Sequence, residues 1–295
     1  MQATVLQLFL TLFLTSSMKK FIVLCLALIC AYSASAWTRA VHAGVAAIAD
    51  ANLTPTAKQN IDNLLDGRTI IYYAQWLKDM GDTKGYEHTR AWRNVAMTPK
   101  GKLIIGKKAE KHSVPQINSA KAYDALVEAM TALQSAELTK EKKADHLRTI
   151  VSIIADLHCP THYIFTDMVE KRDMVFYNSA NKKHKYSLYW EKAALFGTFT
   201  WRTNELVYLL NRKTPEQVAA LTNGSVTKWI TGNAPIYRDV YNMLEDGTHF
   251  NKKSLREWQN KIYPIALEQV ATAGYRLAAV LNGLFDPNVE CVKIK

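Results

Sequence analysis

Residues 156–162 read Asp156-Leu157-His158-Cys159-Pro160-Thr161-His162 and place three possible metal ligands within seven residues. The stretch follows a helical pattern, and Pro160 turns the last histidine away from the axis of that helix. Aspartate and histidine are common zinc ligands, so the spacing predicts a metal site at this helix end. The alternative is structural, because histidines at a helix terminus also bond its last free carbonyl oxygens.

On both sides of this stretch apolar residues recur at helical spacing, which predicts an all-α, single-domain, multi-helix protein with long loops. Thr54 before Pro55 and Thr214 before Pro215 are typical helix starts. Residues 81–118 are expected to form a long surface loop with one short strand pair near 103–105, and 163–183 a polar, mixed segment. The expected helices are 41–49, 55–65, 70–80, 119–135, 139–157, 186–210, 215–230, 234–244 and 254–285.

The composition is that of a folded globular protein, with 48% hydrophobic and 21% charged residues in a chain of 295. Lys and Arg total 37 against 26 Asp and Glu, giving a formal net charge of +11. A basic surface favours anionic partners such as nucleic acid, phosphate esters or acidic lipid. Runs of lysine such as those near 107–111 and 182–185 more often form a solvent-exposed surface than a binding site.

Residues 1–36 are predicted to be an export signal rather than part of the fold. Met18-Lys19-Lys20 precedes an apolar run, and Ala34-Ser35-Ala36 has the small-x-small pattern that signal peptidase recognises. We take Met18 as the true start. A tandem membrane anchor is the alternative, but neither apolar run reaches the roughly 20 residues of a bilayer span.

Export places the mature protein in the periplasm or outside the cell, with no stable membrane span. Residues 37–285 are then the helical domain and 286–295 a C-terminal tail. Cys159 and Cys291 remain after cleavage. They either pair in an oxidising compartment or stay as two thiols.

Cleavage after Ala36 makes Trp37 the new N-terminus, five residues before His42. Together with Asp-x-His-x-Pro-x-His, this pattern resembles the S1/P1 nucleases, which are single-strand-specific zinc nucleases related to bacterial zinc phospholipase C. The resemblance covers residues 37–285 and implies a helical domain in which three zinc ions in a cleft hydrolyse phosphate esters, including single-stranded nucleic acid and 3′-nucleotides. Further matches are Leu53-Thr54-Pro55, Trp76, Trp92, Tyr189-Trp190-Glu191 and Ala273-Gly274-Tyr275.

The ligands that the resemblance implies are unevenly present. Trp37, through its amine and carbonyl, matches one zinc site in full together with His42 and Asp156. A second site keeps His162 and Glu191, but Ser187 stands where a histidine is expected.

The remaining zinc site keeps only the bridging Asp156, because Lys78, Arg93 and Ser152 replace an aspartate and two histidines of the family pattern. We hypothesise that Lys78 and Arg93 substitute for that ion and pair with Asp156, since an unpaired buried carboxylate costs several kcal/mol. The alternative is that Lys78 and Arg93 are both solvated surface charges in a pocket whose sequence has diverged. The implied cofactor is zinc, with one or two bound ions rather than three, or none. His158 is expected to contact the metal ligands rather than the metal itself.

Three function classes remain open. The first is a zinc-dependent phosphodiester hydrolase with reduced or lost activity, in which Asp156 is the catalytic carboxylate and Lys78 and Arg93 bind substrate phosphate. The second is a non-catalytic binder of single-stranded nucleic acid, a nucleotide or another anionic ligand. The third is an exported helical partner protein without a small-molecule site.

Overall fold

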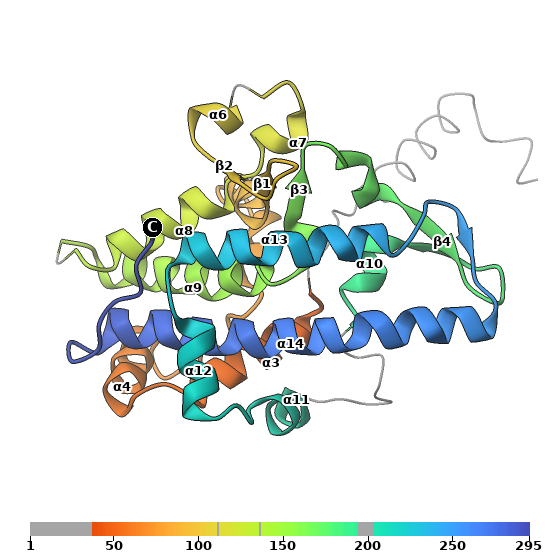
Figure 1. Cartoon of the computed structure of the whole chain (residues 1–295). Helices are drawn as coiled ribbons and strands as arrows, with labels where there is room; N and C mark the ends of the chain where they lie inside the picture. Colours follow the sequence, from red (N-terminus) through yellow and green to blue (C-terminus); the bar gives the residue numbers. More distant parts are fainter. Residues whose placement is uncertain (1–36, 111, 136, 194–202) are drawn as a thin grey trace, which may run out of the picture. The chain divides into compact units, whose positions relative to one another are not determined.

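The computed structural model describes residues 37–110, 112–135, 137–193 and 203–295, so the expected export signal lies outside the described residues. Helices dominate these residues and strands are few and short, which confirms the mostly α-helical fold class (Figure 1). The α-helices are α3 (Arg39–Asp50), α4 (Pro55–Leu64), α5 (Trp76–Gly81), α6 (Lys107–Glu110), α7 (Pro115–Asn118), α8 (Ala122–Ala132), α9 (Lys140–Asp156), α10 (Tyr186–Trp190), α11 (Thr203–Leu210), α12 (Pro215–Thr222), α13 (Val226–Asn242) and α14 (Lys252–Phe285). Short 3₁₀ helices are η1 (Glu87–Arg93), η2 (Pro160–His162) and η3 (Val169–Asp173).

Several helices begin where side chains satisfy the free amides of the first turn. Thr54 accepts a hydrogen bond from the amide of Ala57 ahead of α4, which carries Pro55 at its first position. Thr214 and Gln217 form a reciprocal capping box ahead of α12. Such caps contribute about 1 kcal/mol each, and they are readable in the sequence because the whole interaction spans four residues.

Two small three-stranded sheets occupy the segments expected to be loops. The first has the order β2-β1-β3, with β1 (Val95–Met97) antiparallel to β2 (Leu103–Ile104) and parallel to β3 (Tyr163–Phe165). The second has the order β5-β4-β6, with β4 (Val175–Tyr177) antiparallel to β5 (Lys183–Lys185) and parallel to β6 (Thr248–His249). The expected strand near 103–105 is therefore present, but its sheet also includes a strand far away in sequence.

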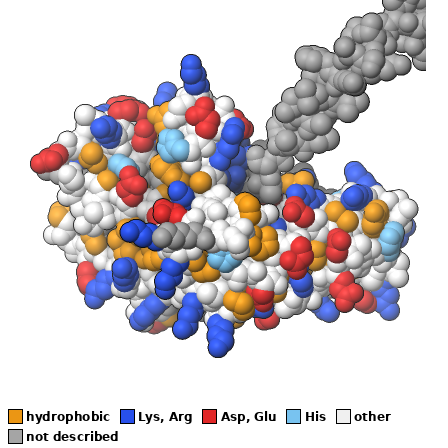
Figure 2. All heavy atoms as spheres, turned by 90° about the horizontal axis from the view of Figure 1, so that it is seen from above, with side chains coloured by type: hydrophobic (Ala, Val, Ile, Leu, Met, Phe, Trp, Pro, Cys, Tyr) orange, Lys and Arg blue, Asp and Glu red, His pale blue; other side chains and the backbone are white. Residues whose placement is uncertain are grey.

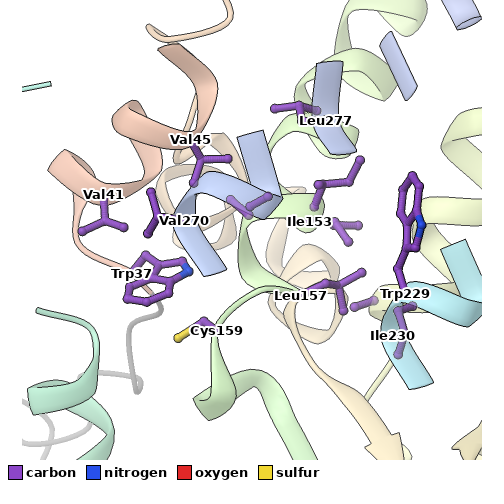
Figure 3. Close-up of a cluster of buried hydrophobic side chains, with 14 of the residues drawn as sticks. Trp37, Val41, Val45, Ile153, Leu157, Cys159, Trp229, Ile230, Val270 and Leu277 are labelled. Carbon is purple, nitrogen blue, oxygen red and sulfur yellow. The ribbon is translucent and has the colours of Figure 1, made fainter. Parts of the chain in front are cut away.

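The core is built where α14 packs against α3 and α9. A Cβ on Gly274 of α14 would lie 2.5 Å from Ile48 Cγ2 of α3, so only glycine permits this close approach. Figure 3 shows Trp37 seated in this core beside Val41 and Cys159. Trp37 is fully buried, which fixes the start of α3 against the end of α9.

Two expected helices are shorter than the sequence indicated. The helix expected at 70–80 begins only at Trp76, because Thr69 to Ala74 form successive i to i+3 turns. This run of β-branched and aromatic residues has low helix propensity. The helix expected at 186–210 ends early, since α10 ends at Trp190; residues 194–202 of that range lie outside the described residues, and α11 covers Thr203–Leu210.

The break expected near 231–233 is wrong. The chain instead breaks at Asn223-Gly224, where Gly224 has a φ of 102° and Ser225 caps α13. The helix then continues through Pro235, although an internal proline costs about 3 kcal/mol. One helical face carries the buried residues Trp229, Ile230, Asn233, Ala234, Tyr237, Val240 and Tyr241, and its burial offsets that cost.

The C-terminal segment packs on the domain. The amides of Val226 and Thr227 donate to the carbonyls of Lys293 and Ile294, each at 3.0 Å. Cys159 and Cys291 do not pair, because the Cys159 thiol lies 3.1 Å from the Thr161 hydroxyl whereas the Cys291 thiol donates to the Gly283 carbonyl at 2.7 Å. Of the two alternatives left open by the sequence, the structure shows two free thiols.

Candidate functional site

Asp156 is the last residue of α9 and has no solvent exposure. The chain turns at Cys159, and Pro160 opens η2, which returns His162 toward the end of α9. His42 approaches from α3. The Nε2 atoms of His42 and His162 lie 3.2 and 3.3 Å from Asp156 Oδ1. The structure therefore brings together three of the predicted ligands from distant parts of the sequence.

Arg93 completes the surroundings of this carboxylate from the end of η1. Its Nε donates to Asp156 Oδ2 at 3.0 Å and its Nη2 to Oδ1 at 3.4 Å. Arg93 is only 8% exposed. This two-point contact is the geometry in which a guanidinium binds a carboxylate most strongly.

The charges around Asp156 favour its ionised form. Burial by itself raises the pKa of this carboxyl, but the Arg93 guanidinium, followed by His162 and His42, holds the pKa well below its usual range. Burial also lowers the pKa of His162 to about 3, so its imidazole is neutral near pH 7. Arg93 is therefore the cation that balances Asp156.

The orientation of the His162 ring is set by Asn94, a residue that the sequence did not single out. His162 Nδ1 lies 3.0 Å from Asn94 Oδ1, which also accepts a hydrogen bond from Arg172 at 3.3 Å. An N–H on His162 Nδ1 can donate to this oxygen, so the contact with Asn94 fixes the plane of the ring whose other nitrogen faces Asp156. A lone asparagine after Arg93 carries no spacing signal, so only the folded structure reveals its role.

Glu191 lies just beyond α10 and is 4% exposed. Burial raises the pKa of its carboxyl to about 9, although Arg93 and Lys78 oppose the change. Glu191 Oε1 and the Ser187 hydroxyl, one turn earlier, are buried and have no hydrogen-bond partner among the described residues. The second predicted ligand group therefore contains a protonated acid beside an unsatisfied serine.

Trp37 lies next to this group. The amide of Thr38 donates to the Glu191 carbonyl at 3.3 Å, and the Gln75 side chain donates to the Trp37 carbonyl at 2.9 Å. The Trp37 carbonyl, which the resemblance implies as a zinc ligand, thus already accepts a hydrogen bond. Gln75 is another residue that the sequence pattern did not reveal.

For Lys78 the structure does not support the hypothesis of pairing with Asp156. Its side chain is exposed, and it forms no ion pair with Asp156. Its charge acts on Glu191 instead, where it opposes the rise in pKa. Ser152 is buried between the Leu77 amide and the Ala74 carbonyl, each 3.4 Å from its hydroxyl.

His158 is buried, and it bonds none of the predicted ligands. Its Nδ1 lies 2.8 Å from the Ile154 carbonyl, and its Nε2 lies 2.9 Å from Arg276 Nη1. Arginine has no acceptor, so Nε2 accepts from Arg276 and Nδ1 donates to the carbonyl. Both nitrogens bond partners outside the ligand set, so these bonds hold the end of α9 against α14.

The donor set does not fit the zinc cluster that the resemblance implies. Within residues 37–110, 112–135, 137–193 and 203–295, no group of three or more His, Cys, Asp or Glu is arranged to hold a metal ion. Arg93 binds both oxygens of Asp156, and Ser152 and Ser187 stand at two expected histidine positions. The site is a buried ion pair bordered by two imidazoles.

A comparison with models of known protein families identifies the family of this chain. The S1/P1 nuclease family model matches residues 37–286, which is most of the chain. The chain therefore belongs to the S1/P1 nuclease family, whose members are generally zinc-dependent. The comparison with curated proteins gave no match. Within the described part of the chain, no helix is long and apolar enough to span a membrane.

Proposed function

We propose that this chain keeps the scaffold of a nuclease-like phosphodiester hydrolase but has reduced or lost hydrolytic activity. The observation that carries the proposal is the buried pair of Arg93 and Asp156, with 3.0 Å between Nε and Oδ2. A guanidinium is a fixed cation that cannot activate a bound water molecule as a metal does, so it can balance Asp156 without supplying a nucleophile.

A second function, binding of a phosphate-bearing or other anionic ligand, is favoured by the charges near Glu191. Lys78 is exposed there, and both Lys78 and Arg93 act on the Glu191 carboxyl. A phosphate would accept hydrogen bonds from these cations without hydrolysis. The overall positive charge adds little to this argument, because Lys and Arg are interspersed with Asp and Glu on the face shown in Figure 2.

The sharpest test restores the family pattern. The wild-type chain and the triple variant Lys78→Asp, Arg93→His, Ser152→His are purified, and zinc content and cleavage of single-stranded DNA and a 3′-nucleotide are measured. The wild type should hold fewer than three zinc ions and cleave slowly or not at all, whereas the variant should gain zinc and activity. Three zinc ions and efficient cleavage in the wild type would refute the proposal.

Titration of the wild type with inorganic phosphate and with a nucleotide, in the presence of a chelator, tests whether the chain binds anions without hydrolysing them. Lys78→Ala should weaken binding, while Lys84→Ala, a lysine outside the site, should not. Equal binding by the two variants would exclude the site as the anion-binding surface.

We also propose that the protein is exported after removal of residues 1–36. The support is the signal-like pattern ending at Ala34-Ser35-Ala36 and the start of the family match at Trp37. The N-terminus of protein recovered outside the cytoplasm should be Trp37. An N-terminus at Met1 or Met18 would overturn this proposal.

A further inference from the structure

A cavity of about 950 Å³ lies beside α5, and Gln75 and Trp76 are among the residues that line it. Its volume is in the range of small-molecule binding sites, about 300–1,000 Å³. We call it the Tyr72 pocket, defined by the lining residues Arg39, Arg68, Tyr72, Tyr73, Trp76 and Arg148.

Among the described residues that line the Tyr72 pocket are three arginines and a single acid, Asp79. Arg39 pairs with Asp79 at 2.8 Å, although its side chain remains 65% exposed. Arg68 is exposed and forms no ion pair with any described residue; it donates a hydrogen bond to the Tyr73 hydroxyl at 3.2 Å. Arg68 is thus the guanidinium best able to accept an anion.

Arg148 has a different role in the pocket wall. It is largely buried and pairs with Asp145 at 2.8 Å and Glu141 at 3.0 Å. Its guanidinium carbon lies 4.5 Å from the centre of the Tyr73 ring. Arg148 therefore holds Tyr73 in place, and its own charge is already balanced.

Tyr72 is 67% exposed, one of few large hydrophobic side chains so placed among the described residues. Its ring packs edge to face against Tyr73 at 4.9 Å, and the Arg68 guanidinium carbon lies 5.4 Å from its centre. An exposed aromatic ring therefore lies beside an arginine that no described carboxylate pairs with. Aromatic stacking together with guanidinium groups is how proteins bind single-stranded nucleic acid without reading its sequence.

The Tyr72 pocket contains none of the side chains that contact Asp156, although Gln75, which bonds the Trp37 carbonyl, also lines it. Trp76 and Asp79 line the pocket, whereas Lys78 acts on Glu191. Side chains of successive helix residues point about 100° apart, so adjacent residues of α5 can face the pocket on one side and Glu191 on the other. None of the predicted ligands lines the pocket.

We propose that the Tyr72 pocket binds a nucleotide, either free or as one unit of a single strand. The phosphate lies on Arg68, whose planar fork matches its oxygens, and the base stacks on Tyr72. Binding here involves no bond cleavage, so it stands independently of whether Asp156 supports hydrolysis.

The test measures binding of a fluorescent oligothymidylate with phosphorothioate linkages to the full chain by anisotropy, with AMP, adenosine and inorganic phosphate as competitors. Tyr72→Ala and Arg68→Ala should each weaken binding about 10-fold, because stacking of one base contributes on the order of 1–3 kcal/mol. Tyr72→Phe should bind as the wild type does. AMP should compete better than adenosine or phosphate alone.

The chain provides a matched control. Tyr208 is 76% exposed and the Arg212 guanidinium carbon lies 4.5 Å from its ring centre, but neither residue lines the pocket. Tyr208→Ala and Arg212→Ala should leave binding unchanged. Competition by AMP assigns a free nucleotide, and competition by oligonucleotide alone assigns a strand. Wild-type binding by Tyr72→Ala and Arg68→Ala, or equal losses in the control pair, would overturn the proposal.

Discussion

Replacing Arg93 with methionine should destabilise the protein strongly. Methionine keeps much of the side-chain length but removes the cation from a carboxylate with no solvent exposure. Breaking a buried ion pair from one side costs about 3–5 kcal/mol, because the remaining charge stays buried without compensation. In the Arg93→Met variant Asp156 can instead take up a proton, which limits the loss in free energy of unfolding to this range.

Arg90 provides the comparison within the same 3₁₀ helix. It pairs with Asp82 at 2.8 Å, a shorter contact than that of Arg93, but the two side chains are 58% and 71% exposed. Exposed pairs contribute about 0–1 kcal/mol, so Arg90→Met should cost several-fold less than Arg93→Met. The comparison therefore separates burial from distance as the source of stability.

The assay is urea unfolding at pH 7 with a chelator present, for both single variants and for Arg93→Met combined with Asp156→Asn. The double variant should recover much of the loss, since it removes the uncompensated charge. In a parallel series without chelator, added zinc should stabilise Arg93→Met more than the wild type if the guanidinium occupies the position of a cation. Equal losses for Arg93→Met and Arg90→Met, or no recovery in the double variant, would refute the reasoning.

Three further predictions concern other parts of the molecule. Glu191 has a pKa raised to about 9 by burial, so the folded state holds a proton that the unfolded state releases above its ordinary pKa of 4.5. The free energy of unfolding of the wild type should therefore fall as pH rises from 5 to 8. In urea titrations with a chelator, the difference in free energy of unfolding between Glu191→Gln and the wild type should grow by up to about 1.4 kcal/mol per pH unit. A difference that stays constant with pH would contradict the raised pKa of Glu191. Gly274→Ala should cost about 1–3 kcal/mol because its Cβ would meet Ile48, whereas Gly232→Ala, with nothing within 4 Å, should be neutral or stabilising in thermal unfolding; equal midpoints would contradict the close packing. Because Cys159 and Cys291 are unpaired, a reductant should not change the unfolding midpoint, and a lower midpoint would reveal a disulfide.

Local features of the sequence were sufficient for much of the helical fold. Thr54 and Thr214 mark helix starts because a cap and its amide lie within four residues. The stretch from Asp156 to His162 also predicts its own geometry, since Pro160 forces the turn that returns His162. The break expected near 231–233 is absent because α13 continues through Pro235, and the burial of one face of this helix outweighs the local cost of the proline.

The family pattern, most helix starts and the replacement of zinc-ligand types at Lys78, Arg93 and Ser152 can all be read from the order of residues. That Arg93 binds Asp156 while Lys78 remains exposed, and that Arg68 and Tyr72 border one pocket, follows only from how the chain packs. The two kinds of feature differ in the sequence distance over which they are set. Caps and turns are set by neighbours along the chain, whereas the partner of a buried charge is set by packing between elements 63 residues apart.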